Sequence, residues 1–365
     1  MFDLIVIGAG SGGLAAAKRA AGYGKKVLLC ENDTIGGTCV SFGCVPKKIW
    51  HGIGHMAHTF KVAKDYGFES DNIAFSWPVV QQKVHQYILG LNHRHETFCK
   101  DKGVTIVRGT ATLVNATTIS INDTQYSGTH ILIAVGSTAT TLDIPGSHLC
   151  DTSYSFFGWT SLPKRVAIIG GGYIAVELAS VLNALGAEVH IIIRKKQVLR
   201  GFDTDMRTQL QDAYTKRGIN IHTSQTVTKI EEHGGALTVA LSNRNELTVD
   251  RVIQAVGRHA NTQALNCDAA GVVCTETGAI VVNDAYQTTV PSIYALGDCI
   301  DKEQLTPVAI AQARQWVDRV FGTIPFPVDF TYIPTAIFSL PEAACVGLTE
   351  SDAMEAYDTI TTRVL

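Results

Sequence analysis

Two glycine-rich turns, each placed between an apolar stretch and a helix-like stretch, constrain the fold of this chain more than any other feature. The first, Gly8-Ala9-Gly10-Ser11-Gly12-Gly13, follows the apolar run 4–7. The second, Gly170-Gly171-Gly172-Tyr173-Ile174-Ala175, follows the stretch 165–169, which is apolar after Arg165. Both have the strand–turn–helix context of a dinucleotide-binding βαβ unit, in which glycines let backbone N–H groups approach a pyrophosphate. The sequence therefore predicts an α/β fold with two Rossmann-like units.

Length and charge narrow the class of protein further. A chain of 365 residues predicts two to three domains. Its 46% hydrophobic and 17% charged residues are typical of a well-buried globular protein. The net charge of −3 offers no electrostatic reason to bind nucleic acid or a membrane surface. No apolar run approaches the roughly 20 residues that a membrane-spanning helix needs.

Periodicity and turn residues predict further elements between and after the two turns. We expect helices over 14–22, 47–63, 78–100 and 176–185. We expect strands over 26–30, 104–107, 118–121, 130–135, 188–193, 237–241, 247–255 and 292–298.

The residues that end the second strand of each unit differ in charge. The first unit has Glu31 there, where a carboxylate would accept the ribose hydroxyls of an adenosine. The second has Arg194 and Lys195, with Arg200 nearby. Guanidinium groups bind a 2′-phosphate that an acid would repel, so the second unit favours NADPH over NADH. The alternative is that these are ordinary solvated basic residues.

Two cysteines follow the first unit, in the stretch Gly36-Gly37-Thr38-Cys39-Val40-Ser41-Phe42-Gly43-Cys44-Val45-Pro46-Lys47-Lys48. Pro46 suits the first turn of a helix, so a Cys44 thiolate would lie at a helix N-terminus and near Lys47, and both lower a thiol pKa. A dithiol beside a nucleotide site indicates electron relay to a disulfide. The alternative is a pair of buried structural cysteines.

The odd number of cysteines, nine, scattered over the chain fits a reducing compartment. The first residues run directly into a strand without a signal peptide, so we expect a cytoplasmic location. His51, His55 and His58 share a helix face, but no carboxylate or cysteine follows at ligand spacing. We therefore expect no metal site.

Together these motifs resemble the pyridine nucleotide–disulfide oxidoreductase family over essentially the whole chain, most of all its branch that reduces glutathione disulfide. The stretches that carry the resemblance are 8–13, 36–48, 170–177, 194, 199–203, 255–258, 294–298, 305–309 and 333–335. The resemblance implies FAD on the first unit and NADPH on the second. The expected cofactor contacts are Gly8, Gly10, Ser11, Gly12, Gly13, Glu31, Gly37, Thr38, Cys39, Lys47, Ala111, Asp298, Thr306, Gly170, Gly171, Gly172, Ile174, Ala175, Glu177, Arg194, Lys195, Arg200 and Gly257.

The resemblance also implies the catalytic roles. Cys44 would face the flavin, while Cys39 would attack the substrate disulfide. Lys47 would pair with Glu177 beside the flavin ring, and Tyr173 would cover the ring until the nicotinamide displaces it.

Glutathione disulfide is the expected substrate partner. Its anionic groups would meet Arg314 and Lys18, with Ser11 as a further contact. The chain departs from the family at His95, where a substrate-contacting tyrosine is usual, and at Ser41-Phe42, where Asn-Val is usual. These two departures put the exact disulfide in doubt. Ala134-Val135-Gly136 replaces Ala-Thr-Gly, a change of similar shape that leaves FAD binding plausible.

The implied domains are 1–140 for FAD and the dithiol, 141–260 for NADPH, 261–330 for the rest of the FAD domain, and 331–365 for the start of an α+β dimerisation domain. In the family that last domain forms a homodimer and supplies a His-Pro general acid to the partner subunit. No His-Pro dipeptide occurs here. We therefore expect a truncated chain with a reductive half-reaction, impaired disulfide turnover and doubtful dimerisation.

Other readings of the sequence remain open. High-molecular-weight thioredoxin reductases are the main alternative, and mercuric reductases a weaker one. Dihydrolipoamide dehydrogenases are disfavoured by Lys47-Lys48 and by Arg194. A redox-inert nucleotide-binding protein would keep the same fold without the chemistry.

Overall fold

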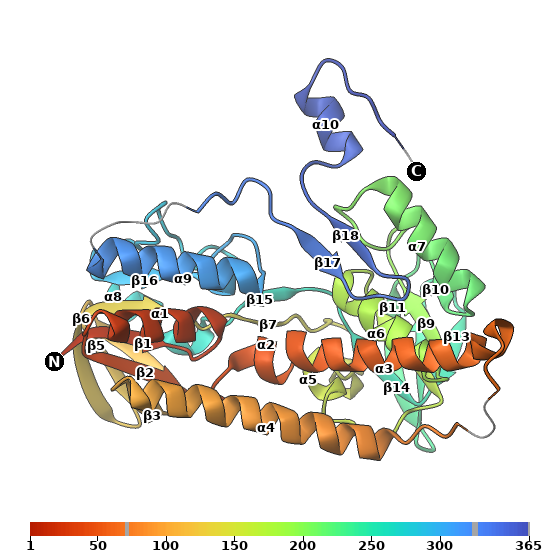
Figure 1. Cartoon of the computed structure of the whole chain (residues 1–365), viewed down its shortest axis with the longest axis horizontal. Helices are drawn as coiled ribbons and strands as arrows, with labels where there is room; N and C mark the ends of the chain where they lie inside the picture. Colours follow the sequence, from red (N-terminus) through yellow and green to blue (C-terminus); the bar gives the residue numbers. More distant parts are fainter. Residues whose placement is uncertain (70–72, 323–327, 364–365) are drawn as a thin grey trace. The chain divides into compact units, whose positions relative to one another are not determined.

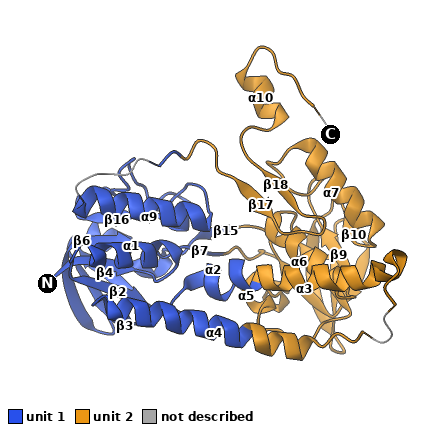
Figure 2. Cartoon of the chain, viewed as in Figure 1, with its two compact units in different colours: residues 1–46, 85–138, 258–329 blue, residues 47–84, 139–257, 330–365 orange. Residues whose placement is uncertain are grey.

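Each glycine turn joins a buried strand to the helix that follows it. In the computed structural model, which describes residues 1–69, 73–322 and 328–363, β1 (Phe2–Ile7) leads into α1 (Ser11–Gly22), and β8 (Arg165–Ile169) leads into α6 (Tyr173–Ala184) (Figure 1). The chain divides into unit 1, made of residues 1–46, 85–138 and 258–329, and unit 2, made of 47–84, 139–257 and 330–365 (Figure 2). The predicted α/β fold with two Rossmann-like units is confirmed.

Unit 1 is built on a sheet in the order β3-β2-β1-β6-β5-β4, with β16 also paired to β6. β1, β2, β3, β6 and β16 are parallel, whereas β4, β5 and the first half of β6 form an antiparallel meander. The remaining bounds are β2 (Val27–Glu31), β3 (Thr105–Arg108), β4 (Ala111–Asn115), β5 (Thr118–Ile121), β6 (Thr124–Ile133) and β16 (Ile293–Ala295).

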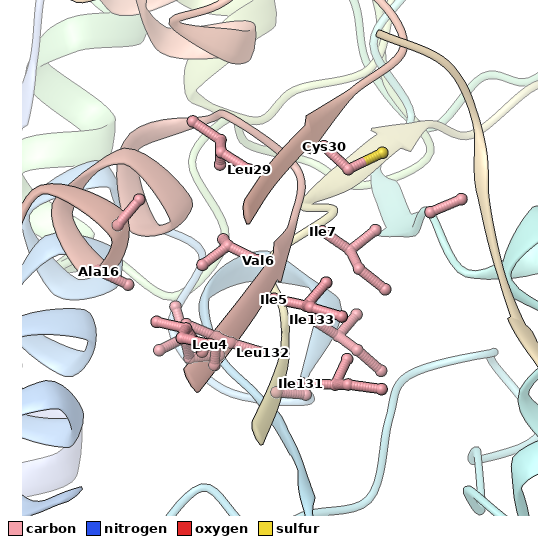
Figure 3. Close-up of a cluster of buried hydrophobic side chains, with 14 of the residues drawn as sticks. Leu4, Ile5, Val6, Ile7, Ala16, Leu29, Cys30, Ile131, Leu132 and Ile133 are labelled. Atoms are coloured by element: carbon pink, nitrogen blue, oxygen red, sulfur yellow. The ribbon is translucent and has the colours of Figure 1, made fainter. Parts of the chain in front are cut away.

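The core of unit 1 lies on both faces of the parallel strands. Leu4, Ile5 and Val6 are fully buried, as are Ile131 and Leu132 of β6 beside them (Figure 3). Strands buried on both faces read as continuous apolar runs, and for this reason their positions were predictable from the sequence. α1 and α9 (Thr306–Phe321) lie side by side against this sheet (Figure 1).

Unit 2 contains a parallel sheet in the order β10-β9-β8-β14 and an antiparallel meander, β11-β12-β13. The bounds are β9 (Glu188–Ile192), β10 (Asn220–His222), β11 (Val227–His233), β12 (Ala236–Leu241), β13 (Glu246–Val249) and β14 (Arg251–Gln254). Its helices include α5 (Ser153–Phe156), α7 (Thr204–Lys216) and α10 (Glu350–Ala356), and β17 (Thr335–Ile337) pairs with β18 (Ala343–Cys345).

Two long helices and several short elements complete the fold. They are α2 (Gly37–Ser41), α3 (Cys44–Val62), α4 (Trp77–Asp101), α8 (Cys267–Ala270), β7 (Ser137–Ala139), β15 (Arg258–Ala260), and the 3-10 turns η1 (Ala63–Tyr66), η2 (Ser147–Leu149), η3 (Gln263–Leu265) and η4 (Gly297–Cys299). None of the helices in the described ranges combines the length and the apolar character needed to cross a bilayer.

The structure corrects two predicted strands. The strand predicted over 292–298 is limited to β16, and Asp298 lies in the 3-10 turn η4 instead. Residues 247–255 form two strands, β13 and β14, that belong to different sheets. The break falls at Asp250, whose carboxylate accepts hydrogen bonds from the backbone N–H groups of Lys164 and Arg165. A single continuous strand cannot pair with β12 in one sheet and with β8 in the other, so the chain changes direction at Asp250. The four predicted domains stay a prediction, and residues 70–72, 323–327 and 364–365 within them lie outside the described residues.

Candidate functional site

The two cysteines of the predicted dithiol are in contact within unit 1. Cys39 lies in α2 and Cys44 is the first residue of α3, and both are half-buried. A hydrogen bond to Cys44, together with burial, raises the pKa of Cys39 well above its ordinary value. Cys39 therefore keeps its proton and donates it to Cys44.

Three helices begin around this pair of sulfurs. Ser11 and Thr306 are the first residues of α1 and α9, and their hydroxyls hydrogen-bond to Cys39, which opposes part of the rise in its pKa. Cys44 Sγ also lies 3.5 Å from Thr306 Oγ1. Helix N-termini carry a partial positive charge, so their convergence favours a thiolate at this place.

Asn92, a residue that the sequence did not single out, holds the cysteine loop from α4. Its side-chain amide donates to the carbonyl oxygen of Ile35 at 2.6 Å and to Ser41 Oγ at 3.0 Å. Ser41 is one of the departures from the family pattern, and here it supplies an acceptor for this contact. Nothing in the sequence around Asn92 predicts a partner this far away in the chain.

The first glycine turn has the backbone geometry of a phosphate-binding loop. A Cβ on Gly8, where φ is 100°, would lie 2.4 Å from the carbonyl oxygen of Ala134, and one on Gly13 would lie 1.9 Å from that of Gly8. These two positions therefore exclude any side chain. At Gly10 a Cβ would meet nothing within 4 Å, so the backbone at the start of α1 faces open space. That space fits a pyrophosphate on the helix N-terminus.

Glu31 braces the same turn from the end of β2. Its carboxylate accepts from the backbone N–H of Ala9 at 2.7 Å and from that of Asp33 at 2.8 Å. Each carboxylate oxygen has a second lone pair, so these contacts leave acceptor capacity for ribose hydroxyls. The acid thus orders the loop that it is expected to serve.

Asp298, the expected ribityl contact, lies in η4 and is fixed by two residues that the sequence analysis missed. Ser137 Oγ donates to its carboxylate at 2.9 Å. Arg258 donates in turn to Ser137, through Nε to the hydroxyl at 2.8 Å and through its terminal nitrogen to the carbonyl at 2.6 Å. Arg258 belongs to a motif that carried the resemblance, but only the fold places it behind Asp298.

The basic residues after β9 lie on a loop that folds back onto the second glycine turn. The backbone N–H of Leu199 donates to the carbonyl of Gly171 at 2.6 Å. This contact places the next residue, Arg200, beside the start of α6, and Arg194 and Lys195 are exposed on the same loop. A Cβ on Gly172 would meet nothing within 4 Å, so this turn too offers room for phosphates.

Within unit 2, Lys47 and Glu177 form the expected ion pair. Lys47 Nζ lies 2.8 Å from Glu177 Oε1, with the two side chains 17% and 3% exposed. The same oxygen accepts from the backbone N–H of Phe338 at 2.8 Å, and the Lys47 ammonium lies 4.2 Å from the Phe338 ring centroid. Phe338 is a further residue that the sequence did not predict. Tyr173, the first residue of α6, is exposed.

The two side chains predicted to bind the anionic groups of the substrate, Arg314 and Lys18, lie in different environments. Arg314 is exposed on α9. Lys18 on α1 donates to Nδ1 of His95 at 2.9 Å. Burial lowers the pKa of Lys18, and burial with the positive charge of Lys18 lowers the pKa of His95. This contact joins Lys18 to the position where His95 departs from the family.

The remaining predicted contacts are placed as follows. A Cβ on Gly37 would lie 2.6 Å from the Cα of Gly10, so the cysteine loop packs directly on the first glycine turn. Ala111 and Ala175 are buried, and Thr38 is exposed. In the parts of the chain that the structure describes, no three His, Cys, Asp or Glu residues gather at metal-binding distances. Of the three histidines on the predicted helix, His51 is buried, and its Nε2 lies 3.2 Å from the carbonyl oxygen of Ser339.

Two Rossmann-like turns and a contacting cysteine pair at converging helix N-termini are typical of a dinucleotide-dependent redox protein. The family model for pyridine nucleotide-disulphide oxidoreductases matches residues 2–313. The chain belongs to this family, whose members bind FAD and a pyridine nucleotide.

Several glutathione reductases are similar to this chain over almost its whole length. A glutathione reductase of Schizosaccharomyces pombe is 40% identical over 98% of this chain and 80% of its own length. Glutathione reductases of Nostoc sp. and Burkholderia cepacia are 39% and 38% identical, over 96% and 98% of this chain and 79% and 80% of their own lengths.

Proposed function

We propose that this chain is an FAD-dependent disulfide reductase that oxidises NADPH and acts on glutathione disulfide. The observation that carries the proposal is the contact between Cys39 and Cys44 at the start of α3, with Cys39 protonated by preference. The glutathione reductases at 38–40% identity support the choice of substrate.

The two glycine turns suit the two cofactors. Gly10 and Gly172 leave open space at the N-termini of α1 and α6, where a pyrophosphate would bind. Glu31 and Asp298 would hold FAD through hydroxyl groups, and Arg194 and Arg200 would hold the 2′-phosphate of NADPH. When bound, FAD would accept a hydride from NADPH and pass two electrons to the disulfide between Cys39 and Cys44.

The residues of the chain then move electrons to the substrate. Opening of the Cys39–Cys44 disulfide gives one thiolate and one thiol, and the N-terminus of α3 stabilises the charge on Cys44. Cys39 attacks one sulfur of glutathione disulfide, so that a Cys39–glutathione bond forms and one glutathione leaves and takes a proton. Cys44 attacks Cys39 next, which restores the disulfide and releases the second glutathione.

Thiol counting tests the proposal. One equivalent of NADPH, added without oxygen to the FAD-bound protein, should expose two additional thiols that alkylation maps to Cys39 and Cys44. Cys345→Ser, at an exposed cysteine, is the matched control and should keep both. Absence of new thiols would support the redox-inert alternative instead.

Substrate choice needs a second comparison. Reoxidation of the reduced dithiol by glutathione disulfide should be faster than by cystine or by oxidised thioredoxin. Preference for thioredoxin would move the chain to the thioredoxin reductases. We also propose a cytoplasmic location, because an odd number of cysteines, nine, scattered over the chain fits a reducing compartment. Cell fractionation would test this location, and sedimentation would test whether the chain dimerises, which we expect to be doubtful.

A further inference from the structure

A second pair of cysteines lies in contact in unit 1, outside the redox motif. Cys267 is the first residue of α8, and Cys274 follows that helix; both are half-buried and their side chains hydrogen-bond to each other. We propose that Cys267 and Cys274 are a second redox-active dithiol, which low-molecular-weight disulfides such as glutathione disulfide oxidise to an intrachain disulfide. This goes beyond the reductase function and does not depend on it.

The backbone around α8 brings the two sulfurs together. Gly271, with φ of 78°, reverses the chain after the helix, and the N–H of Val272 donates to the carbonyl of Cys267 at 3.0 Å. Thr289 Oγ1 donates to the carbonyl of Gly271 at 2.8 Å and so holds this turn. Cys274 therefore returns past the first residue of α8, and the contact between the thiols is set by hydrogen-bonded backbone.

Cys274 is also tied to the region of the expected flavin contact. It forms an antiparallel bridge with Ile280, and the N–H of Ile280 donates to the carbonyl of Cys299 at 2.9 Å. Cys299 directly follows Asp298 in η4. The second dithiol is thus joined by main-chain contacts to η4, the turn that carries the expected FAD contact Asp298.

The two sulfurs differ in reactivity. Burial and the neighbouring Cys274 raise the pKa of Cys267 to about 12. Cys267 therefore keeps its proton more firmly than an ordinary cysteine, and we assign the first attack to Cys274. The thiolate is the reacting form of a cysteine, and a half-buried sulfur leaves room for a small disulfide.

The oxidation proceeds in two balanced exchanges. Cys274 attacks one sulfur of glutathione disulfide, a Cys274–glutathione bond forms, and one glutathione leaves and takes a proton. Cys267 then loses its proton and attacks Cys274, which releases the second glutathione and closes the Cys267–Cys274 bond. Two electrons pass from the protein to glutathione disulfide, and two glutathione molecules result.

Peptide mapping of the full, FAD-bound chain tests the proposal. The protein is incubated with glutathione disulfide and quenched with acid, and its free thiols are then alkylated. Proteolysis on the N-terminal side of aspartates cuts between Cys267 and Asp268, so Cys267 and Cys274 fall on different peptides. The wild type should give a cross-linked peptide pair. In the Cys267→Ser variant, glutathione should remain attached to Cys274. In the Cys274→Ser variant, glutathione should attach to Cys267 at a rate at least tenfold lower. Equal rates in the two variants, or full alkylation of both cysteines in the wild type, would overturn the proposal.

Two controls separate this dithiol from other causes. Cys150 is half-buried, and burial raises its pKa to about 12 as well, so it should stay unmodified if pairing, not burial, gives the reactivity. In the double variant Cys39→Ser/Cys44→Ser the Cys267–Cys274 cross-link should still form. Its loss there would show that the first dithiol passes oxidation to the second, and would contradict direct oxidation. Failure of the reductase proposal leaves this result unchanged.

Discussion

Glu177 joins three segments of unit 2 through a single carboxylate oxygen. Oε1 accepts both from Lys47 on α3 and from the backbone of Phe338, while the side chain is 3% exposed. A buried carboxylate with these partners is stable only while both remain, because a lone buried charge is costly. Glu177 is thus a structural residue as well as a candidate catalytic one.

Glu177→Ala should lower the free energy of unfolding by about 3–5 kcal/mol, the usual cost of breaking a buried ion pair. Glu177→Gln should lose less, because the amide oxygen still accepts from the Phe338 N–H. Urea unfolding followed by circular dichroism measures both. Glu188→Gln, at a carboxylate that is 54% exposed, is the control and should change stability by roughly 0.5 kcal/mol or less. Equal losses from Ala and Gln would contradict the shared acceptor.

Arg200 directly follows Leu199, whose backbone N–H donates to Gly171 of the second glycine turn. Arg200→Ala should weaken NADPH binding about tenfold or more, since a hydrogen bond to a charged group is worth roughly 1.5–3 kcal/mol. NADH binding should stay unchanged, because NADH lacks the 2′-phosphate. Fluorescence titration with both nucleotides measures the ratio, and Arg244→Ala, at an exposed cation between β12 and β13, is the control. A matching loss for NADH would refute the 2′-phosphate role.

At the scale of elements, α4 supports α2 through Asn92. Asn92→Ala removes the hydrogen-bond donor of the Ile35 carbonyl oxygen. A buried polar group without a partner lowers the free energy of unfolding by about 1–3 kcal/mol. The variant should lose stability in that range, and Cys39 should be alkylated faster because its loop is less restrained. Asn32→Ala removes an exposed hydrogen bond to Thr110 and should do neither. Unchanged alkylation of Cys39 would show that the loop holds its own shape.

Strands β9 and β10 carry a pH-dependent pair. His190 Nδ1 lies 3.1 Å from His222 Nε2, and His190 Nε2 lies 3.1 Å from Glu188 Oε1. Burial, and then the neighbouring His190, lower the pKa of His222. The unfolded chain therefore binds more protons between that lowered pKa and the ordinary value of about 6.5. Stability contributed by neutral His222 is present above pH 6.5 and is lost as the pH falls through the folded pKa.

His222→Gln should thus flatten the fall in unfolding free energy between pH 7.5 and pH 5.5. Denaturant titrations at the two pH values give the difference for each protein. His148→Gln, at an exposed histidine in η2, should keep the slope of the wild type. A slope unaffected by His222→Gln would assign the pH dependence to other histidines.

Local patterns explain which elements were predictable. The strand 165–169 and the strand 118–121 have the predicted bounds, because apolar residues and turn residues mark both ends. Contacts such as Asn92 with Ser41, or Arg258 with Ser137, join residues far apart in sequence. Such contacts follow from packing, which no local pattern encodes. The same holds for Asp250, whose side chain ends one strand and serves another sheet.

At the scale of the molecule, each unit is assembled from three separated stretches of chain (Figure 2). Unit 1 takes Glu31 and the first glycine turn from the stretch 1–46 and Asp298 from the stretch 258–329. Unit 2 gathers its glycine turn and its basic loop from one stretch, residues 139–257. Each ligand should therefore leave its own pattern of protection along the sequence.

Hydrogen exchange of backbone amides measures that pattern. NADP⁺ added to the FAD-bound protein should slow exchange at 170–175 and 194–201, whereas FAD returned to the apoprotein should slow exchange at 8–13 and 297–306, because ligand binding raises the free energy of local opening. Arg200→Ala should erase the first effect and keep the second. Protection of 8–13 by NADP⁺, with none at 194–201, would mean that the two turns hold the opposite nucleotides.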